Sequence, residues 1–460
     1  MSTRTRAVAA PLLPEVFTRW FSARGWTPRE HQLELLAKAQ AGRSTLLIAP
    51  TGGGKTLAGF LPTLVEFSSS ALATGKASRG LISAGHGVRR TGGLHTLYIS
   101  PLKALAVDIA RNLETPVAEM RLPIRIETRT GDTPASKRQR QRRDPPDILL
   151  TTPEQLALLL ASPDAPYIFG GLRRVVLDEL HSLVLSKRGD LLALGLARLF
   201  RMAPQMMGIG LSATVAEPAE LCRYLVAQPA GGVAEADLIM AQGGAAPVVT
   251  MLDGDAELPW AGHSARHAFQ DIYDLIKRHT TTLVFVNTRM QAEMIFQALW
   301  RINEDGLAIA LHHGSLDVSQ RRKVEGAMAA GRLRAVVCTS SLDLGVDWGD
   351  IDLVINVGAP KGSSRLLQRI GRANHRMDEA SRGVLVPANR FEVLECTAAI
   401  EAVAENAQDT PPLRTGALDV LAQHVLGCAC AAPFLADELY REVATASPYA
   451  KLTRADFDAA

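Results

Sequence analysis

The sequence is poor in cysteine, and none of its five cysteines stands in a C-x-x-C pair: Cys222, Cys338, Cys396, Cys428 and Cys430. That spacing argues against a zinc site, an iron–sulfur cluster or a disulfide framework, and it favours a reducing compartment. The chain also lacks an apolar run long enough to span a bilayer, and no signal-peptide core follows Arg4 and Arg6. We therefore expect a cytoplasmic protein with no membrane partner.

A strong excess of charge is missing too, because the formal net charge is only +3. So small a charge permits a nucleic-acid partner but does not argue for one, because a local basic groove matters more than the total. What is present is the composition of a folded protein, with 460 residues of which 47% are hydrophobic and 21% charged. That length predicts roughly two to four domains.

Short apolar strands alternate with helical stretches along most of the chain. After a helical segment at 12–40, the first half predicts strands at 44–49, 95–100, 147–151, 174–178 and 207–211. The second half predicts strands at 282–287, 307–311, 334–338, 352–357 and 383–386. The alternation is typical of the α/β class, here with two doubly wound parallel sheets covered by helices.

Composition divides the chain into three parts. We expect a first domain over 1–240, with a flexible Gly-, Ser- and Ala-rich insertion at 68–94, and a second domain over 266–408. The segment 241–265 would link them. After a pair of prolines the sequence pattern becomes helical again. We expect 412–460 to be the start of a third domain that this chain holds only in part.

A glycine-rich loop at 49–56 follows the first strand and precedes a helix. This order predicts a phosphate cradle at a helix N-terminus, built from the backbone N–H groups of Gly52, Gly53 and Gly54. Lys55 would contact the β- and γ-phosphates of ATP, and the Thr56 hydroxyl would bind Mg²⁺.

The strand at 174–178 ends in two acidic residues, Asp178 and Glu179. Asp178 would hold Mg²⁺ through water, while Glu179 would position and activate the attacking water. Ahead of the first strand, Gln32 can read adenine through one donor and one acceptor. Trp26 or Arg29 could stack on the same base, although a core aromatic is an equal interpretation of Trp26.

Arg369 and Arg372 lie one turn apart on a predicted helix far along the chain. Guanidinium groups suit the dispersed charge of a phosphoryl-transfer transition state. We expect both arginines to reach the nucleotide from the second domain, so that hydrolysis opens and closes a cleft. The alternative interpretation is a solvated basic helix face.

Three segments place a hydroxyl residue before a proline: Ser100-Pro101, Thr133-Pro134 and Thr152-Pro153. This pattern predicts an N-cap followed by proline at the first helical position. Ordinary capping explains any one of them, but three successive helix starts could dock successive phosphates of a single strand. A basic run at 137–143 could grip the same backbone or be a solvated helix face.

Together these residues resemble a superfamily 2 DExH-box helicase. The motifs fall in that family's order, at Gln32, 49–56, 100–103, 130–132, 151–154, 178–181, 212–214, 284–289, 312–315, 339–347 and 368–375. Within the superfamily the chain is similar to the Lhr group, and 385–395 resembles its bacterial ligase-associated branch. The resemblance implies two tandem RecA-like domains followed by the start of a winged-helix-like domain.

The same resemblance implies an ATP- and Mg²⁺-dependent motor that moves 3′→5′ on single-stranded DNA and unwinds duplex DNA or an RNA–DNA hybrid. It also implies DNA repair beside a DNA ligase and a repair nuclease. Gly345 and Asp347 would touch the nucleotide, the segment 212–214 would couple hydrolysis to strand separation, and His375 takes the place of an arginine that many relatives carry. The expected nucleic-acid contacts are Ser100, Pro101, Lys103, Thr130, Gly131, Thr133, Thr152, Asn287, Arg289, His313 and Thr339.

Two other functions remain open. Contacts to phosphate do not report the sugar, so an RNA remodeller of the same superfamily also fits. A nucleic-acid-binding scaffold with an idle ATPase is a third possibility, against which the presence of Lys55, Asp178, Glu179 and Arg372 counts. The histidine pair at 312–313 has no further ligand at metal spacing, so we expect no metal beyond the Mg²⁺ of ATP.

Overall fold

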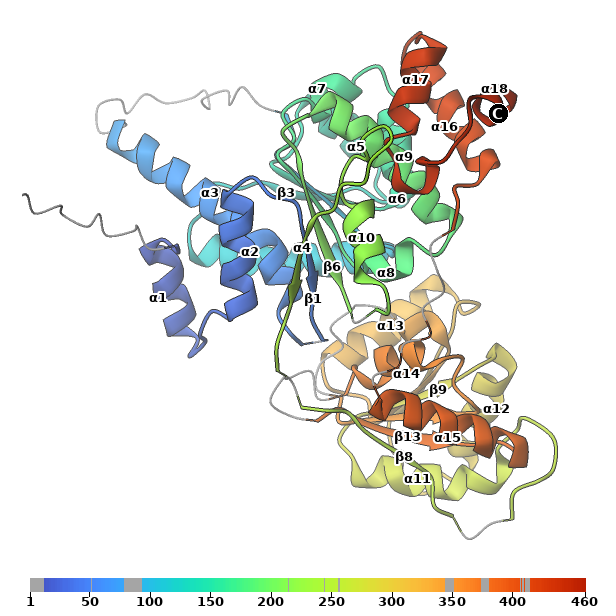
Figure 1. The fold of residues 1–460 in the computed structure, drawn as a ribbon. Helices are drawn as coiled ribbons and strands as arrows, with labels where there is room; N and C mark the ends of the chain where they lie inside the picture. Colours follow the sequence, from blue (N-terminus) through green and yellow to red (C-terminus); the bar gives the residue numbers. More distant parts are fainter. Residues whose placement is uncertain are drawn as a thin grey trace, which may run out of the picture.

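Two parallel sheets, each covered by helices, dominate the computed structural model (Figure 1). The structure describes residues 12–50, 52–77, 93–213, 215–243, 245–254, 257–343, 351–373, 380–405, 407, 409 and 414–460. Within these ranges no helix is both long and apolar enough to cross a membrane.

The first sheet has seven parallel strands in the order β3-β4-β2-β5-β6-β1-β7. All five strands that the sequence predicts here are present. The strands β3 and β7 were not predicted, because both lie at sheet edges, bury only part of their residues and so form no apolar run. The bounds are β1 (Thr45–Ile48), β2 (Thr96–Ile99), β3 (Ile126–Thr128), β4 (Ile148–Thr151), β5 (Arg174–Leu177), β6 (Met207–Ser212) and β7 (Asp237–Met240).

Helices cover both faces of this sheet. Successive strand residues point to opposite faces, so Leu47 and Val176 join one hydrophobic cluster with α3 and α4, whereas Leu46 and Val175 join another with α6 and α9. The helices are α1 (Glu15–Ala23), α2 (Glu30–Gln40), α3 (Lys55–Ala77), α4 (Lys103–Glu119), α5 (Ala135–Arg143), α6 (Pro153–Leu160), α7 (Ala165–Phe169), α8 (Leu180–Leu183), α9 (Lys187–Met202) and α10 (Pro218–Tyr224). The first ten residues of the predicted insertion continue α3, and 78–92 lies outside the described residues.

The second sheet has six parallel strands in the order β10-β11-β9-β12-β13-β8. All five predicted strands are again present. The sixth, β8 (Val248–Met251), lies in the segment expected to be a linker and forms the edge of this sheet beside β13. The other strands are β9 (Thr282–Val286), β10 (Ile309–His312), β11 (Ala335–Cys338), β12 (Leu353–Val357) and β13 (Arg382–Val386).

The helices of the second domain surround this sheet in the lower half of Figure 1. They are η1 (Arg266–Ala268), α11 (Phe269–Arg278), α12 (Arg289–Arg301), α13 (Val318–Ala329), η2 (Ser340–Leu342), α14 (Ser363–Ile370) and α15 (Arg390–Ala404). Amphipathic patterning explains their placement, since α11 buries Ile272, Tyr273 and Ile276 on one face.

The last helices pack on the first domain, although the second domain precedes them in sequence (Figure 1). Leu421, Leu439 and Tyr449 share one hydrophobic cluster with Leu192 and Leu196 of α9. The elements are α16 (Leu418–Ala431), α17 (Ala436–Val443), η3 (Ser447–Tyr449) and α18 (Arg454–Ala459). The first and third domains therefore share a continuous core.

Candidate functional site

Three side chains at the start of α2 hold the glycine-rich loop that joins β1 to α3. Each donates to a different loop carbonyl: Arg29 Nη1 to Gly52 at 3.0 Å, His31 Nε2 to Gly53 at 2.8 Å, and Gln32 Nε2 to Gly54 at 3.2 Å. The C=O and N–H groups of a trans peptide point in opposite directions. Fixing the last two carbonyls toward α2 therefore turns the N–H groups of Gly54 and Lys55 away from it, as an anion cradle requires.

The glycines of this loop are required by close packing. A Cβ on Gly53 would lie 2.8 Å from the Pro50 carbonyl oxygen, and one on Gly54 would lie 2.6 Å from Gln32 Nε2. Gln32 is buried, and its Oε1 also accepts from the Arg29 N–H at 3.0 Å. Its amide thus joins the loop to the N-terminus of α2, and reading adenine would require it to exchange one of these bonds.

Lys55 folds back over its own loop, because its Nζ donates to the Ala49 carbonyl at 2.8 Å. Burial lowers the pKa of Lys55, against the opposing effect of Glu179 and Asp178. The ammonium thus lies in a poorly solvated site that faces two carboxylates. A desolvated cation interacts strongly with a negative group brought close to it.

The two carboxylates at the end of β5 differ in their electrostatics. Burial, and then the charge of Glu179, raise the pKa of Asp178 to about 6. Burial would also raise the pKa of Glu179, but His181, Lys55 and Arg372 together bring it below its usual value. Glu179 therefore stays ionised, as a residue that orients or deprotonates water must.

Sequence reasoning missed Tyr98, which contacts the predicted metal-holding carboxylate. The Tyr98 hydroxyl donates to Asp178 Oδ2 at 2.6 Å, and the Glu179 N–H donates to Oδ1 at 2.9 Å. In the sequence, Tyr98 is one more apolar-strand residue of β2, and no local signal separates it from a core aromatic.

Arg372 reaches this site from the second domain. A cleft of about 740 Å³ is lined by Lys55, Thr56, Asp178 and Glu179 of the first domain together with Arg372. Arg372 is only 3% exposed, and its Nη2 donates to the Asp343 carbonyl at 3.3 Å. The two halves of the predicted site are therefore brought together.

Arg369 lies elsewhere, contrary to the expectation that both arginines reach the nucleotide. Its Nε pairs with Asp343 Oδ1 at 2.9 Å, its Nη1 donates to Asn356 Oδ1 at 2.5 Å, and its guanidinium lies over the Phe285 ring. This buried network holds the Arg369 side chain inside the second domain. Spacing along α14 could not reveal it, because the partners come from distant segments.

The same cleft extends past Gln32 to an aromatic pair. Trp26 is 55% exposed, meets the Trp20 ring edge to face at 5.8 Å and lines the cleft, so it is not a core aromatic. The Arg24 guanidinium lies 4.6 Å from the centre of the Trp20 ring and is held by Glu119. These residues extend the cleft beyond the phosphate cradle on the side where adenine recognition is predicted.

His181 connects three predicted motifs. Its Nδ1 lies 3.1 Å from Ser212 Oγ, and its Nε2 lies 2.8 Å from the side-chain amide nitrogen of Gln368 in the second domain. Burial lowers the pKa of His181, against the opposing effect of the Glu179 charge. The predicted residues Gly345, Asp347, His375 and Thr214 lie outside the described residues.

The predicted nucleic-acid residues of the first domain gather beyond the carboxyl ends of β2, β3 and β4. Lys103 Nζ pairs with Asp132 at 3.2 Å. A Cβ on Gly131 would lie 2.9 Å from the same Lys103 Nζ. The Thr133 hydroxyl accepts from the Thr130 N–H at 2.9 Å. These strands are neighbours in the sheet, so motifs more than 50 residues apart lie along one edge.

The predicted helix caps are only partly correct. Thr152 stands at the predicted N-cap position of α6 with proline at the first position, but its side chain makes no capping hydrogen bond. The Ser100 hydroxyl instead donates to the Leu102 carbonyl at 2.9 Å, and α4 begins only at Lys103. The Thr133 hydroxyl closes a turn and does not cap α5. A hydroxyl before proline is also a turn pattern, which explains the two errors.

The basic run at 137–143 does lie on a helix, α5. Several of its side chains already have partners within the first domain: Arg138 donates to the Gly131 carbonyl, Arg140 pairs with Glu127, and Arg142 pairs with Asp164. The run is therefore partly neutralised.

The predicted contacts of the second domain lie at the carboxyl ends of β9, β10 and β11. Asn287 follows β9, His313 follows β10 beside Glu293 at 3.3 Å, and Thr339 follows β11. Arg289 opens α12, and its Nη2 lies 4.0 Å from the Cβ position of Gly314.

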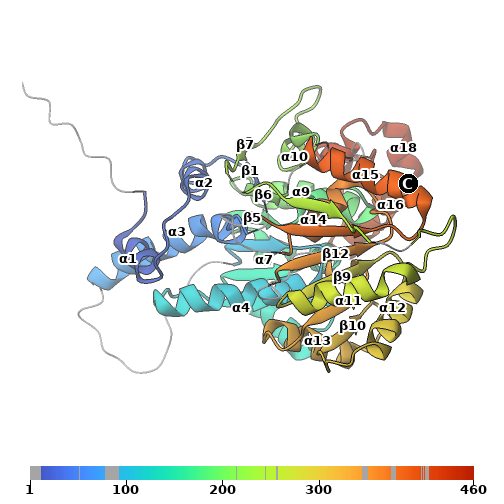
Figure 2. The same cartoon turned by 90° about the horizontal axis from the view of Figure 1, so that it is seen from below.

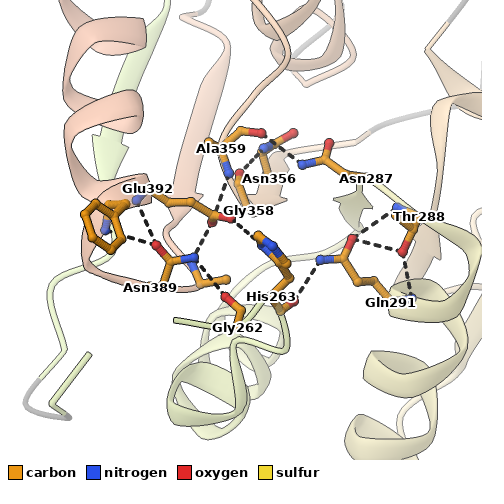
Figure 3. A network of polar contacts seen from close by, with 12 residues as sticks. Gly262, His263, Asn287, Thr288, Gln291, Asn356, Gly358, Ala359, Asn389 and Glu392 are labelled. Atoms are coloured by element: carbon orange, nitrogen blue, oxygen red, sulfur yellow. Dashed lines mark hydrogen bonds and ion pairs between the residues drawn. The ribbon is translucent and has the colours of Figure 1, made fainter. Parts of the chain in front are cut away.

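A polar network in Figure 3 holds Asn287 in place. Its Nδ2 donates to the Ala359 carbonyl at 2.9 Å, and the Ala359 N–H donates to Glu392 Oε2 at 3.2 Å. Glu392 also pairs with His263 at 3.0 Å. Glu392 and His263 were not predicted from the sequence. They tie the segment between β8 and η1 to residues that the sequence assigns to nucleic acid.

A buried cluster of His424, Cys428 and Glu442 has its potential ligand atoms within 4.8 Å of one another. Glu442, however, accepts from Arg198 at 3.2 Å and Arg201 at 2.9 Å, and burial raises the pKa of the Cys428 thiol to about 11. Two guanidinium groups and a neutral thiol oppose a divalent cation. We interpret this cluster as the polar part of the interface between the first and third domains.

Three family models match the chain in succession. They describe a DEAD/DEAH box helicase at 29–221, a helicase conserved C-terminal domain at 267–377, and the winged helix domain of the large helicase-related protein at 401–460.

Curated relatives carry the same description. The chain is 36% identical to an Lhr helicase/probable uracil glycosylase of Mycolicibacterium smegmatis, covering 96% of this chain and 31% of that protein. It is 34% identical to an ATP-dependent helicase Lhr-Core of Methanocaldococcus jannaschii, covering 97% of this chain and 52% of that protein. The chain thus spans between about a third and a half of the length of these relatives.

A solved structure of Mycobacterium smegmatis helicase Lhr bound to ssDNA and AMP-PNP matches with a TM-score of 0.82 and 35% identity. The match covers 97% of this chain and 57% of that one. The helicase MrfA bound to DNA and AMPPNP matches with a TM-score of 0.74 at 24% identity, which supports the fold alone.

Proposed function

Since the chain belongs to the Lhr group of DEAD/DEAH-box helicases, we propose that it is an ATP-dependent helicase that translocates on single-stranded DNA. The observation that carries the proposal is the position of Arg372. This arginine comes from the second domain and lines one cleft with Lys55, Asp178 and Glu179 of the first. A site divided in this way couples the state of the nucleotide to the spacing of the two domains.

In the proposed cycle, ATP phosphates bind to the N–H groups of Gly54 and Lys55, and Lys55 exchanges the Ala49 carbonyl for a phosphate. Glu179, held ionised by its cationic neighbours, orients the attacking water. Arg372 stabilises the charge of the transferring group. Hard oxygen donors at Thr56 and Asp178 suit the Mg²⁺ that accompanies ATP and neutralises part of its phosphate charge.

His181 links the two domains through its side-chain contacts. It contacts Glu179 at 3.4 Å, Ser212 at 3.1 Å and Gln368 at 2.8 Å. Closure of the second domain onto ATP would therefore shift Gln368 and His181, and through them Ser212 at the end of β6. This connection supports the proposal that hydrolysis is coupled to movement along the strand.

DNA is proposed as the substrate because a relative that is 35% identical was solved with ssDNA. Movement in the 3′→5′ direction, a role in repair, work beside a DNA ligase and a repair nuclease, and a cytoplasmic location belong to the same proposal. They rest on the resemblance to this group.

The test is the ATPase rate of this 460-residue chain with no nucleic acid, with single-stranded DNA and with single-stranded RNA of the same sequence. We expect DNA to stimulate hydrolysis at least 10-fold. Lys55→Ala should remove hydrolysis while leaving strand binding, which would be measured by fluorescence anisotropy. Stimulation by RNA alone would reject DNA as the substrate.

The direction is tested separately with duplexes that carry a single-stranded tail on either the 3′ or the 5′ side. A 3′→5′ motor displaces the partner strand only from the 3′-tailed substrate. Equal unwinding by wild type and Lys55→Ala would contradict the whole proposal, because strand separation would then need no ATP.

A further inference from the structure

Tyr98 lies at a position where a tyrosine needs a specific reason. It is in the middle of β2, between β4 and β5, and is fully buried. Its ring stacks on Phe60 of α3, the helix that follows the glycine-rich loop, with ring centres 5.4 Å apart. A buried hydroxyl without a partner costs free energy, and phenylalanine would fill the same space without that cost.

The partner of the Tyr98 hydroxyl is Asp178, whose Oδ2 accepts at 2.6 Å. This is the short distance of a hydrogen bond to an ionised acceptor. The other oxygen, Oδ1, accepts from the Glu179 N–H at 2.9 Å. With both oxygens held from two directions, rotation of the carboxylate about its side-chain bonds is restricted.

The Asp178 carboxylate keeps hydrogen-bonding capacity after these two contacts are made. An ionised carboxylate offers about four lone-pair sites on its two oxygens. Tyr98 and the Glu179 N–H occupy one on each oxygen, so each oxygen keeps capacity for a water molecule. That capacity matches a carboxylate that holds Mg²⁺ through water, because Mg²⁺ keeps several of its waters in protein sites.

We propose that Tyr98 is the positioning residue for Asp178, and that its hydroxyl holds the carboxylate in the orientation that receives the hydrated Mg²⁺ of bound ATP. The inference rests on the proposed ATPase function and adds a residue to it. Tyr98 itself does not line the cleft. It acts through Asp178 and connects that carboxylate, by way of Phe60, to the helix that follows the phosphate cradle.

The experiment uses Tyr98→Phe, which removes one oxygen atom and leaves the ring stack. The first measurement is the Mg²⁺ concentration at half-maximal ATPase rate, at saturating ATP and strand. We expect it to rise about 5- to 10-fold, the size of one lost hydrogen bond. The second is the equilibrium affinity for a fluorescent ATP analogue with Mg²⁺ and with EDTA. The gain in affinity from Mg²⁺ should shrink by the same factor, and the affinity in EDTA should not change.

Tyr224→Phe is the matched control. Tyr224 is also buried in the first domain, and its hydroxyl donates to the Gly189 carbonyl at 2.6 Å. It loses the same atom in a similar environment but does not line the cleft. Both variants should lower the melting temperature by similar amounts, and only Tyr98→Phe should change the Mg²⁺ dependence.

A double-mutant cycle with Asp178→Asn tests whether Tyr98 acts through that carboxylate. In the Asp178→Asn background, Tyr98→Phe should not weaken the Mg²⁺ dependence of analogue binding further. An unchanged Mg²⁺ dependence in Tyr98→Phe, or an equal change in Tyr224→Phe, would overturn the assignment. A wild-type chain that hydrolyses no ATP at any Mg²⁺ concentration would instead reject the proposed function.

Discussion

Arg369 and Arg372 are three residues apart but differ in role, because Arg369 lies on α14 and Arg372 follows the end of that helix. Arg369 is 2% exposed and neutralised by Asp343 within the second domain, whereas Arg372 lines the cleft. The sequence presents them as one basic pattern. Their surroundings make Arg369 a structural residue of the second domain, whereas Arg372 faces the proposed nucleotide site.

Alanine substitutions should therefore separate the two residues. Arg372→Ala should lower kcat by about 10³-fold, the lower end of the range for an arginine finger, with little change in melting temperature. Arg369→Ala removes the buried partner of Asp343 and leaves it the half-exposed Arg365, whose Nε lies 3.5 Å from Asp343 Oδ2. The loss should destabilise the second domain by about 3 kcal/mol, the lower end of the range for a broken buried ion pair. The kcat of steady-state ATP hydrolysis and the melting temperature of both variants would test this separation of roles. Equal melting temperatures for the two variants would contradict this distinction.

At the scale of elements, α16 carries a histidine that links its packing to pH. His424 is 8% exposed, and burial, followed by the nearby charge of Arg198, lowers its pKa from 6.5 to about 4. Between these two values the unfolded chain binds a proton that the folded chain does not. Acid therefore favours the unfolded state in this window.

The free energy of unfolding should fall by about 2 kcal/mol from this residue alone between pH 7.5 and pH 5. The loss should begin near pH 6.5 and level off below pH 4. His424→Gln cannot titrate, so its stability should depend less on pH across the same window. Chemical unfolding of both proteins at pH 7.5 and pH 5 measures the difference. A variant with the same pH dependence as the wild type would show that His424 does not contribute.

At the scale of the whole molecule, the chain divides into two bodies that do not follow sequence order. The first and third domains share one hydrophobic cluster and the Arg198–Glu442 and Arg201–Glu442 ion pairs. The second domain lies below the first in Figure 1, and Figure 2 shows the same arrangement from below. Arg372 of the second domain lines one cleft with Lys55 of the first. ATP should move the second domain relative to the other two.

Distances between fluorescent labels can test this division. Cys430 of α16 is exposed, whereas the other four cysteines are buried, so it provides a label site in the third domain. Cysteines introduced at the exposed positions Gln139 and Glu304 would report the first and second domains. A non-hydrolysable ATP analogue with single-stranded DNA should shorten the distance from Glu304→Cys to Cys430 and leave that from Gln139→Cys unchanged. Equal changes in both pairs would contradict a shared first–third body.

Most strands along the chain, the glycine-rich loop and the acidic pair could be predicted from local sequence. Each is a local pattern in which a few adjacent residues determine backbone shape and burial. The edge strands β3, β7 and β8 were missed because their residues are only partly buried. Two of the three predicted helix caps were wrong because a hydroxyl before proline suits turns as well as helices.

Local sequence patterns were enough to predict a glycine-rich phosphate loop, a pair of carboxylates and an arginine from the second domain. Which of these side chains share one cleft became clear only from the packing of the folded chain. It brought Arg372 to Lys55, turned Arg369 toward Asp343, paired Tyr98 with Asp178, and placed the third domain on the first. A motif follows from neighbours along the chain, whereas a contact across a cleft or core depends on how separate elements pack together.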